Sequence, residues 1–332
     1  MPYHYPGDNK LGRFWLMPHN AEFYRLLTNL DEWKELLPLV DTLGFADHGI
    51  HNLFSSAEKE QGFRIMNELG IPLALETGAI KEWGGVKHGC YGKDMFAVSD
   101  EMWKSHIKHG AKLSAVAFDE PLVNVNIFPD VWDRLGDTEA KFEFAVEQTA
   151  EYIRLIQEEY PDMMIGDIEV YPHFGVDYVM RWVDALQDRL KQKSARPLDF
   201  FRMDVCWAAY VHNTLSTGEN WLEIKKVEDH CKAMGLPFSL IYWGSCVGDF
   251  YIPDTRDPRD AETLNVMWNE QVLDQGAQYK AIGGNPDQFV VQCWDVIGDG
   301  DKKTLVPPAT FPIAKANSYM GTAWEFYNRY VK

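Results

Sequence analysis

The stretch Leu113-Ser114-Ala115-Val116-Ala117-Phe118-Asp119-Glu120-Pro121 joins an apolar run to two adjacent carboxylates and a proline. Such a run indicates a strand that is buried on both faces, as in a parallel sheet. Pro121 has no N–H for the ladder, so we expect the strand to end there. The two acids then stand at the carboxyl end of a buried strand, which is the edge where α/β folds build their sites.

Seven other short apolar segments of the 332-residue chain repeat this pattern, and helical patterns separate most of them. Eight strand–helix repeats with right-handed crossovers predict an α/β fold, a single (β/α)8 TIM barrel. Residues 31–40 form one of the helical patterns, which we expect Gly44 to end. The expected strands are residues 13–18, 45–50, 71–76, 113–121, 163–171, 198–207, 237–243 and 288–295.

An open, doubly wound sheet is the alternative architecture. It usually has a glycine-rich phosphate loop after its first strand, whereas this chain reads Met17-Pro18-His19-Asn20 there, which favours the barrel. No linker or low-complexity segment divides the chain. We therefore expect one barrel domain over residues 1–332, with its active site at the C-terminal ends of the strands.

The composition argues against several kinds of partner. A net charge of −18 repels nucleic-acid phosphates and anionic membrane surfaces, and it also favours solubility. No apolar run reaches the roughly 18 residues of a membrane span. The first ten residues lack the apolar core of a signal peptide, so we expect a cytoplasmic protein, or a secreted one whose signal peptide is not part of this sequence. Five scattered cysteines without a CxxC pair favour a reduced compartment.

Polar and aromatic side chains follow most of the expected strands. A carboxylate at the end of an apolar strand is seldom buried without a partner or a role. Tryptophan, present 12 times, offers a flat apolar face on which sugar rings stack. The candidates at the strand ends are Asp47, His48, Glu76, Asp119, Glu120, Asp167, Glu169, Arg202, Asp204, Trp207, Tyr242, Trp243, Trp294 and Asp295.

The spacing of these residues suggests which of them act. Asp119 and Glu120 are adjacent and point to opposite sides of a strand, and the proline after Glu120 favours that residue as catalytic. Asp167 and Glu169 share a face. If that face is the barrel interior, Glu169 lies nearer the mouth and Asp167 is placed to pair with Arg202.

Arg202 and Asp204 likewise share a face of their strand. A salt bridge between these two is the structural alternative to a direct role for Asp204 in the chemistry. The second carboxylate of the site is therefore predicted to be Glu169 or Asp204.

The ending Phe118-Asp119-Glu120-Pro121 resembles the Asn-Glu-Pro that ends strand four in the largest clan of retaining (β/α)8 glycoside hydrolases. The clan's glutamate is the acid/base, which by position implies Glu120. Gln292-Cys293-Trp294-Asp295 is similar to the clan's aromatic floor, where a Trp lies beneath the sugar. Asp119 replaces the clan's Asn and can also accept from a sugar hydroxyl. The clan's nucleophile follows strand seven, where this chain has Ile241-Tyr242-Trp243-Gly244, so the second acid is expected elsewhere.

Together these features predict a glycoside hydrolase or transglycosidase that acts on an oligosaccharide or glycoside by paired-carboxylate chemistry, with no metal and no cofactor. Glu120 is the expected general acid, and Glu169 or Asp204 is the expected second carboxylate. The side chains expected to bind the substrate are His48, Glu76, Asp119, Trp207, Tyr242, Trp243, Trp294 and Asp295.

Two other functions stay open. A metal-dependent sugar isomerase or epimerase would use Glu169, Asp204 and Asp295 as part of a ligand shell, and Ile168-Glu169 and Met203-Asp204 are similar to the xylose-isomerase-like barrels. Strand seven offers no histidine for such a shell. A non-catalytic sugar-binding barrel is the third reading, although the number of acids favours an enzyme. The sequence leaves the sugar, the linkage and the oligomeric state open.

Overall fold

The structure is a computed structural model that describes residues 2–7, 10–80, 91–127, 136–206, 221–244, 261–293, 296–297, 304–305, 313 and 317–332. Eight parallel strands form a closed barrel in the order of the sequence, and β8 pairs with β1 to complete it. The predicted (β/α)8 barrel is therefore confirmed. The strands are β1 (Phe14–Met17), β2 (Thr42–Ala46), β3 (Leu73–Thr77), β4 (Leu113–Asp119), β5 (Met164–Tyr171), β6 (Phe200–Val205), β7 (Phe238–Tyr242) and β8 (Gln288–Gln292).

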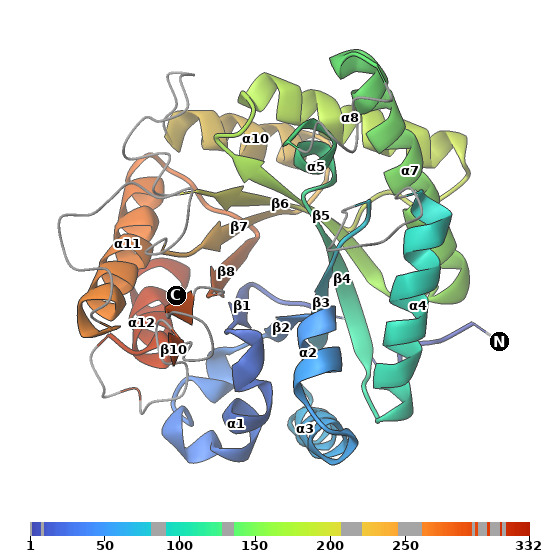
Figure 1. Cartoon of the computed structure of the whole chain (residues 1–332). Helices are drawn as coiled ribbons and strands as arrows, with labels where there is room; N and C mark the ends of the chain where they lie inside the picture. Colours follow the sequence, from blue (N-terminus) through green and yellow to red (C-terminus); the bar gives the residue numbers. More distant parts are fainter. Residues whose placement is uncertain are drawn as a thin grey trace.

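Helices surround the barrel, and Figure 1 shows them as an outer ring around the converging strands. A short antiparallel pair, β9 (Val296–Ile297) and β10 (Thr304–Leu305), lies outside the barrel sheet. Within the described residues, no helix is both long and apolar enough to cross a membrane. The helices are α1 (Phe23–Thr28), α2 (Asp47–Leu53), α3 (Ser56–Leu69), α4 (Gly92–Lys108), α5 (Pro121–Ile127), α7 (Thr138–Glu159), α8 (Val176–Gln192), α10 (Trp221–Ala233), α11 (Ala261–Ala281) and α12 (Tyr319–Phe326).

Local signals explain where these helices begin and end. Helix α3 begins with a capping box, in which the Ser55 side chain accepts from the Glu58 N–H and the Glu58 side chain accepts from the Ser55 N–H. It ends at Gly70, whose φ of 69° is the left-handed conformation that glycine adopts at low cost. Asp137 caps α7 in the same way as Ser55, through its side chain.

The second strand differs from the prediction. Residues 31–40 form no long helix but two 3-10 turns, η2 (Leu30–Glu32) and η3 (Leu37–Leu39). Gly44 does not end a helix but lies inside β2, and the segment from Asp47 onward is helix rather than strand. Only glycine fits at position 44, because a Cβ there would come within 2.6 Å of Met17 Cγ. Strand β2 therefore needs a residue without a side chain where it packs against Met17 of β1.

The interior of the barrel is filled by side chains from alternate positions of each strand, as this fold requires. Trp15 and Phe200 meet edge to face there, with ring centroids 5.6 Å apart. Gly166 opposes Phe200 so closely that a Cβ would come within 2.0 Å of its ring. The inward-facing apolar cluster contains Leu11, Trp15, Met17, Ala74, Ala115, Ala117, Ile168, Phe200, Ile241, Trp243 and Val290.

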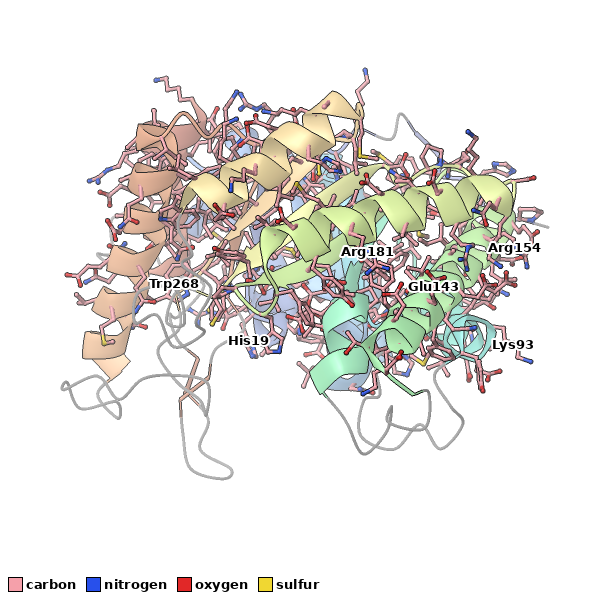
Figure 2. The ribbon with its side chains drawn as sticks, turned by 90° about the horizontal axis from the view of Figure 1, so that it is seen from above. His19, Lys93, Glu143, Arg154, Arg181 and Trp268 are labelled. Atoms are coloured by element: carbon pink, nitrogen blue, oxygen red, sulfur yellow. The ribbon has the colours of Figure 1, made fainter. Side chains whose placement is uncertain are left out.

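The outer layer is held by apolar packing and by charge pairs between helices. Helices α7 and α8 run side by side, and Figure 2 shows Glu143 and Arg154 along α7, with Arg181 of α8 near Glu143. Arg189 of α8 donates to Glu143 at 3.0 Å, and Arg181 lies over the ring of Phe142 at 4.1 Å. Because these pairs are partly exposed, each contributes little to stability, about 0–1 kcal/mol.

Candidate active site

The inward positions of the barrel become polar at the carboxyl ends of the strands. Side chains two apart on a strand share a face, so the apolar interior set identifies the polar residues that follow it. Glu76 follows Ala74, Asp119 follows Ala117, and Gln292 follows Val290. On β6, Arg202 and Asp204 follow Phe200 in turn. Three carboxylates, a guanidinium and an amide thus converge on the barrel mouth.

Asp204 is the carboxylate that this environment perturbs most. Its residue is 6% exposed, and the indole Nε1–H of Trp243 donates to its Oδ1. Burial raises the pKa of Asp204 well above its usual range, and the nearby charges of Glu120, Glu76 and Asp119 raise it further, against the lowering effect of the Trp243 hydrogen bond. Asp204 is therefore placed to carry a proton.

Glu120 stands next to Asp119 in an unusual backbone conformation. Its φ is +57°, in the left-handed region that non-glycine residues rarely occupy. Two backbone hydrogen bonds hold it: its N–H donates to Ile168 O on β5, and its C=O accepts from Asn124 N in α5, both at 2.9 Å. Among its neighbours, Glu120 has the largest charge effect on Asp204. This pair spans the mouth from β4 to β6.

His48 faces the same carboxylates from the start of α2. Its Nδ1 lies 3.7 Å from Oδ1 of Asp47, and its side chain is 49% exposed. The hydrogen bond to Asp47 raises the pKa of His48, and the charges of Asp47, Glu76 and Asp119 add to this against burial. Asp47 itself is buried and accepts from Trp103 Nε1 at 3.2 Å, so it anchors the start of α2.

Glu169 and Asp167 lie on the opposite face of β5, outside the barrel interior. Ile168 between them belongs to the interior cluster. Glu169 accepts from the backbone N–H of Leu122 at 2.7 Å and of Val123 at 3.3 Å, at the start of α5. Glu169 therefore serves as an acceptor at the start of α5 on the outer side of β5, and the charge of Glu120 also acts on it.

Asp167 is equally committed to the outer shell. It is fully buried and accepts from Nε1 of Trp182 on α8 at 2.6 Å. Burial raises its pKa to about 7, and burial together with the charge of Asp167 raises the pKa of Glu169 well above its usual range. The expected pairing of Asp167 with Arg202 is wrong, because the two side chains lie on opposite faces of the barrel wall.

Arg202 is buried inside the barrel beneath the carboxylates. Its Nε donates to Ser239 Oγ at 2.9 Å, its Nη1 to Met17 Sδ at 3.6 Å, and its guanidinium lies 4.4 Å from the ring centroid of Trp15. Burial lowers the pKa of Arg202 to about 9, against the raising effect of the charge of Glu76. Among the described side chains, no ion pair joins Arg202 to Asp204, so that alternative does not hold.

Gln292 on β8 is a residue of the mouth that the sequence reasoning passed over. Its Nε2 donates to Oε2 of Glu76 at 2.8 Å, which links β8 to β3 across the barrel. The signal that could have found it is its spacing, since Gln288, Val290 and Gln292 alternate on one face of β8.

Tyr242, the last residue of β7, and Trp243, which follows it, point to opposite faces of the barrel wall by the same rule. Trp243 is in the interior cluster and donates to Asp204. Tyr242 points outward and packs between Phe289, stacked at 6.0 Å, and Phe326, at 4.6 Å. The ring of Tyr242 is thus buried between the barrel and α12, on the outer side of β7, and its predicted contact with substrate stays a prediction. Trp207, Trp294 and Asp295 lie outside the described residues.

Metal binding needs several ligands in one place. In the part of the chain that the structure describes, no group of three or more His, Cys, Asp or Glu side chains is arranged to hold a metal ion. The carboxylates of the mouth instead alternate with Gln292, Trp243 and Arg202, which donate hydrogen bonds to them or lie beneath them.

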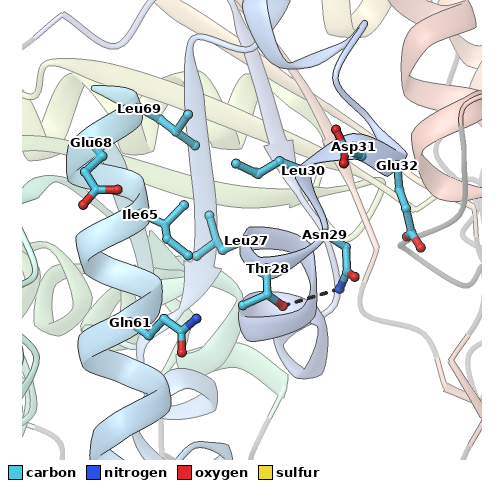
Figure 3. Close-up of a pocket in the computed structure, with 10 residues that line it drawn as sticks. All are labelled: Leu27, Thr28, Asn29, Leu30, Asp31, Glu32, Gln61, Ile65, Glu68 and Leu69. Atoms are coloured by element: carbon cyan, nitrogen blue, oxygen red, sulfur yellow. Dashed lines mark hydrogen bonds between the residues drawn. The ribbon is translucent and has the colours of Figure 1, made fainter.

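A surface hollow of about 500 Å³ lies away from the mouth (Figure 3). Its walls are the end of α1 with the residues after it, and one face of α3, including Leu27, Asn29, Gln61 and Glu68. Both helices end there and lead back toward the amino ends of the strands. In barrels of this kind that end serves stability rather than catalysis, so the hollow is not the candidate site.

Comparison with known proteins supports the architecture. No family model matches the sequence, and no curated protein is similar enough to count as a relative. Among solved structures, an endoxylanase of glycoside hydrolase family 10 from a sugarcane soil metagenome has a TM-score of 0.53 at 11% identity, over 96% of this chain and 97% of that chain.

A D-psicose 3-epimerase, solved in the presence of D-fructose, is similar to the same degree. Its TM-score is 0.51 at 12% identity, over 96% of this chain and 98% of the epimerase chain. Because one neighbour is a xylanase and the other an epimerase, the likeness identifies the fold and does not select the reaction.

Proposed function

We propose that this protein is a glycoside hydrolase or transglycosidase in which Glu120 and Asp204 form the catalytic carboxylate pair. The observation that carries the proposal is the place of these two acids at the carboxyl ends of β4 and β6, where burial raises the pKa of Asp204 and the charge of Glu120 raises it further. Glycoside cleavage needs one carboxyl group that holds a proton and one that is ionised, and unlike environments provide that division.

In the proposed mechanism Asp204 is the proton donor. Its proton passes to the glycosidic oxygen as the bond to the leaving group breaks, while Glu120 acts on the sugar carbon, either directly or through a water. The resemblance to the retaining clan implied the acid role for Glu120. We assign it to Asp204 because burial and neighbouring charges raise the pKa of Asp204 and so favour its protonated form.

The other groups of the mouth would bind the sugar. Glu76, Asp119 and His48 carry hydrogen-bonding atoms that face the same space as the pair. Trp243 fixes the carboxyl of Asp204 through its indole N–H. Trp207, Trp294 and Asp295 remain predicted contributors. Glu169, turned toward α5, has no part in the proposed chemistry.

The test compares Glu120→Gln and Asp204→Asn with wild type on nitrophenyl glycosides and oligosaccharides of glucose, xylose, galactose and mannose. Each variant should lose at least about a hundredfold in kcat, the usual contribution of acid/base catalysis. Asp204→Asn should lose less on dinitrophenyl glycosides, whose leaving group needs no proton. Asp199→Asn is the matched control, since Asp199 lies just before β6 at its amino end and should be dispensable for chemistry.

The same assays separate the rival functions. Activity that disappears with a chelator and returns with a divalent ion would replace the proposal with a metal-dependent isomerase or epimerase. Sugar binding without any turnover by wild type would leave a binding barrel. Full activity in Glu120→Gln would remove that residue from the mechanism.

A further inference from the structure

Within the part of the chain that the structure describes, two buried polar atoms near the carboxylates have no hydrogen-bond partner. They are Nη2 of Arg202, on a residue that is 0% exposed, and Oε1 of Gln292, on a residue that is 5% exposed. One is a donor and the other is an acceptor. A buried polar atom left unpaired costs roughly 1–3 kcal/mol, so a pair at the floor of a candidate site calls for an explanation.

The contacts around Gln292 determine which atom stays unpaired. Its amide N–H donates to Oε2 of Glu76 at 2.8 Å, and a carboxylate can only accept this bond, so the amide orientation is fixed. The carbonyl oxygen Oε1 is then the end without a partner. Gln292 is the last residue of β8 and faces inward, so this acceptor belongs to the mouth rather than to the deep core.

Arg202 reaches the same region from β6. Its Nη1 donates to Sδ of Met17, and Met17 is the register partner of Gln292 across β1 and β8. The charge of Glu76, which Gln292 contacts, acts on Arg202 as well. The guanidinium therefore lies against Met17, the register partner of Gln292, and is within reach of the charge of Glu76; Nε and Nη1 are engaged, and Nη2 has no partner among the described residues.

The chemistry of these atoms selects the kind of ligand group. A carboxylate or phosphate would face Glu76 and the carbonyl of Gln292, and an ammonium group would face Arg202. A hydroxyl group both donates and accepts, so it alone among common neutral ligand groups of that size satisfies a guanidinium N–H and an amide oxygen together. A sugar carries such hydroxyls on a rigid ring.

We propose that Arg202 and Gln292 form the floor of a subsite that receives one hydroxyl group of a polyhydroxylated substrate. The inference rests on the proposed function, because it takes the substrate to be a carbohydrate. Arg202 and Gln292 would then distinguish a sugar that has this hydroxyl from one that lacks it. Glu76 is held by Gln292 at the edge of this subsite, where it can accept from a neighbouring hydroxyl.

The test measures binding rather than turnover. Wild type is titrated with D-glucose, D-xylose, D-galactose and D-mannose by saturation-transfer NMR, and then with every monodeoxy analogue of the sugar that binds best. One deoxy position should weaken binding by about tenfold or more, because it leaves both buried atoms unpaired again. The remaining deoxy positions should have smaller effects.

Variants then link that position to these residues. Gln292→Leu and Arg202→Lys should weaken binding of the parent sugar by about tenfold and leave binding of the critical deoxy analogue almost unchanged. Gln288→Leu is the matched control: it removes the same amide from the same face of β8, at the amino end, and should behave as wild type. The deoxy series on wild type keeps the test valid even if a variant fails to fold.

The outcomes are separable from those of the proposed function. Equal binding of all deoxy analogues, or no binding of any of the four sugars, would overturn the subsite. So would variants that weaken the critical deoxy analogue as much as its parent sugar. If Glu120→Gln and Asp204→Asn keep full activity while the deoxy pattern holds, the catalytic assignment fails and the subsite stands.

Discussion

The left-handed backbone of Glu120 has a measurable cost in stability. For an L-residue the left-handed region costs roughly 1–2 kcal/mol relative to right-handed or extended backbone, and glycine avoids this cost. Glycine also has more freedom in the unfolded chain, which offsets about 0.4–1 kcal/mol. With φ at +57°, Glu120→Gly should therefore be more stable than Glu120→Ala by about 1 kcal/mol.

Alanine is the right reference for this comparison. Both variants remove the carboxylate and its interaction with Asp204, so their difference isolates the backbone. Urea unfolding followed by far-UV circular dichroism gives both midpoints. Both variants should also lose glycosidase activity by at least about a hundredfold. A stabilised but inactive Glu120→Gly would show that the site maintains strain for function.

Ser194 provides the control for the measurement. It has a φ of +56°, lies just after α8, and is exposed and remote from the mouth. The free energy of unfolding of Ser194→Gly should exceed that of Ser194→Ala by a similar amount, and both variants should keep wild-type activity. If the Ser194 pair shows this difference and the Glu120 variants have equal midpoints, the claim of strain at Glu120 is refuted.

Three further predictions concern the carboxylates. The folded-state pKa of Asp204 is raised, so the stability of the wild type should fall as the pH rises from about 4 through that pKa. Asp204→Asn should lack this fall and should have a higher melting temperature than wild type at pH 7. Melting temperatures of the two proteins that change in parallel with pH would contradict this prediction. Trp243→Phe removes a hydrogen bond that lowers the pKa of Asp204, so the basic limb of the pH–kcat profile should shift to higher pH. A basic limb at the same pH as in wild type would show that Asp204 does not set it. Glu169→Gln should keep activity within a few-fold of wild type, since Glu169 bonds Leu122 and Val123 outside the mouth; a loss as large as that of Glu120→Gln would return it to the catalytic pair.

The barrel was predictable because each buried parallel strand is a short apolar run with clear punctuation. The predicted strand at residues 163–171 differs from β5 by one residue. Helix α5 was missed, although Pro121 at its first position is a known start signal. Pro121 thus follows the end of β4 and is also the first residue of α5.

The direction of the side chains was the harder part of the site. A strand buried on both faces shows no alternation of polar and apolar residues, so the sequence of β5 does not state which face Glu169 takes. The information was present in residue size instead. Gly166 shares its face with Ile168, and the crowded interior beside Phe200 accepts only glycine there, which places Glu169 outside.

Contacts across the barrel could not be deduced from spacing alone. The hydrogen bond from Gln292 to Glu76 joins residues that are 216 positions apart in the sequence. The packing of Arg202 on Trp15 joins β6 to β1, which are also not neighbours in the barrel. These contacts depend on how the strands tilt and close, which only the assembled barrel fixes.

The carboxylates and the amide of the mouth belong to the strands or to the first residue after them, and this has a consequence for engineering. Asp204, Gln292 and Glu76 are strand residues, and Glu120 directly follows β4. Side chains on such rigid elements keep their geometry when the connecting loops are exchanged. The segments that follow β6 and β7 could therefore be replaced from other barrels to change which substrates the proposed site accepts, while Glu120 and Asp204 stay in their places.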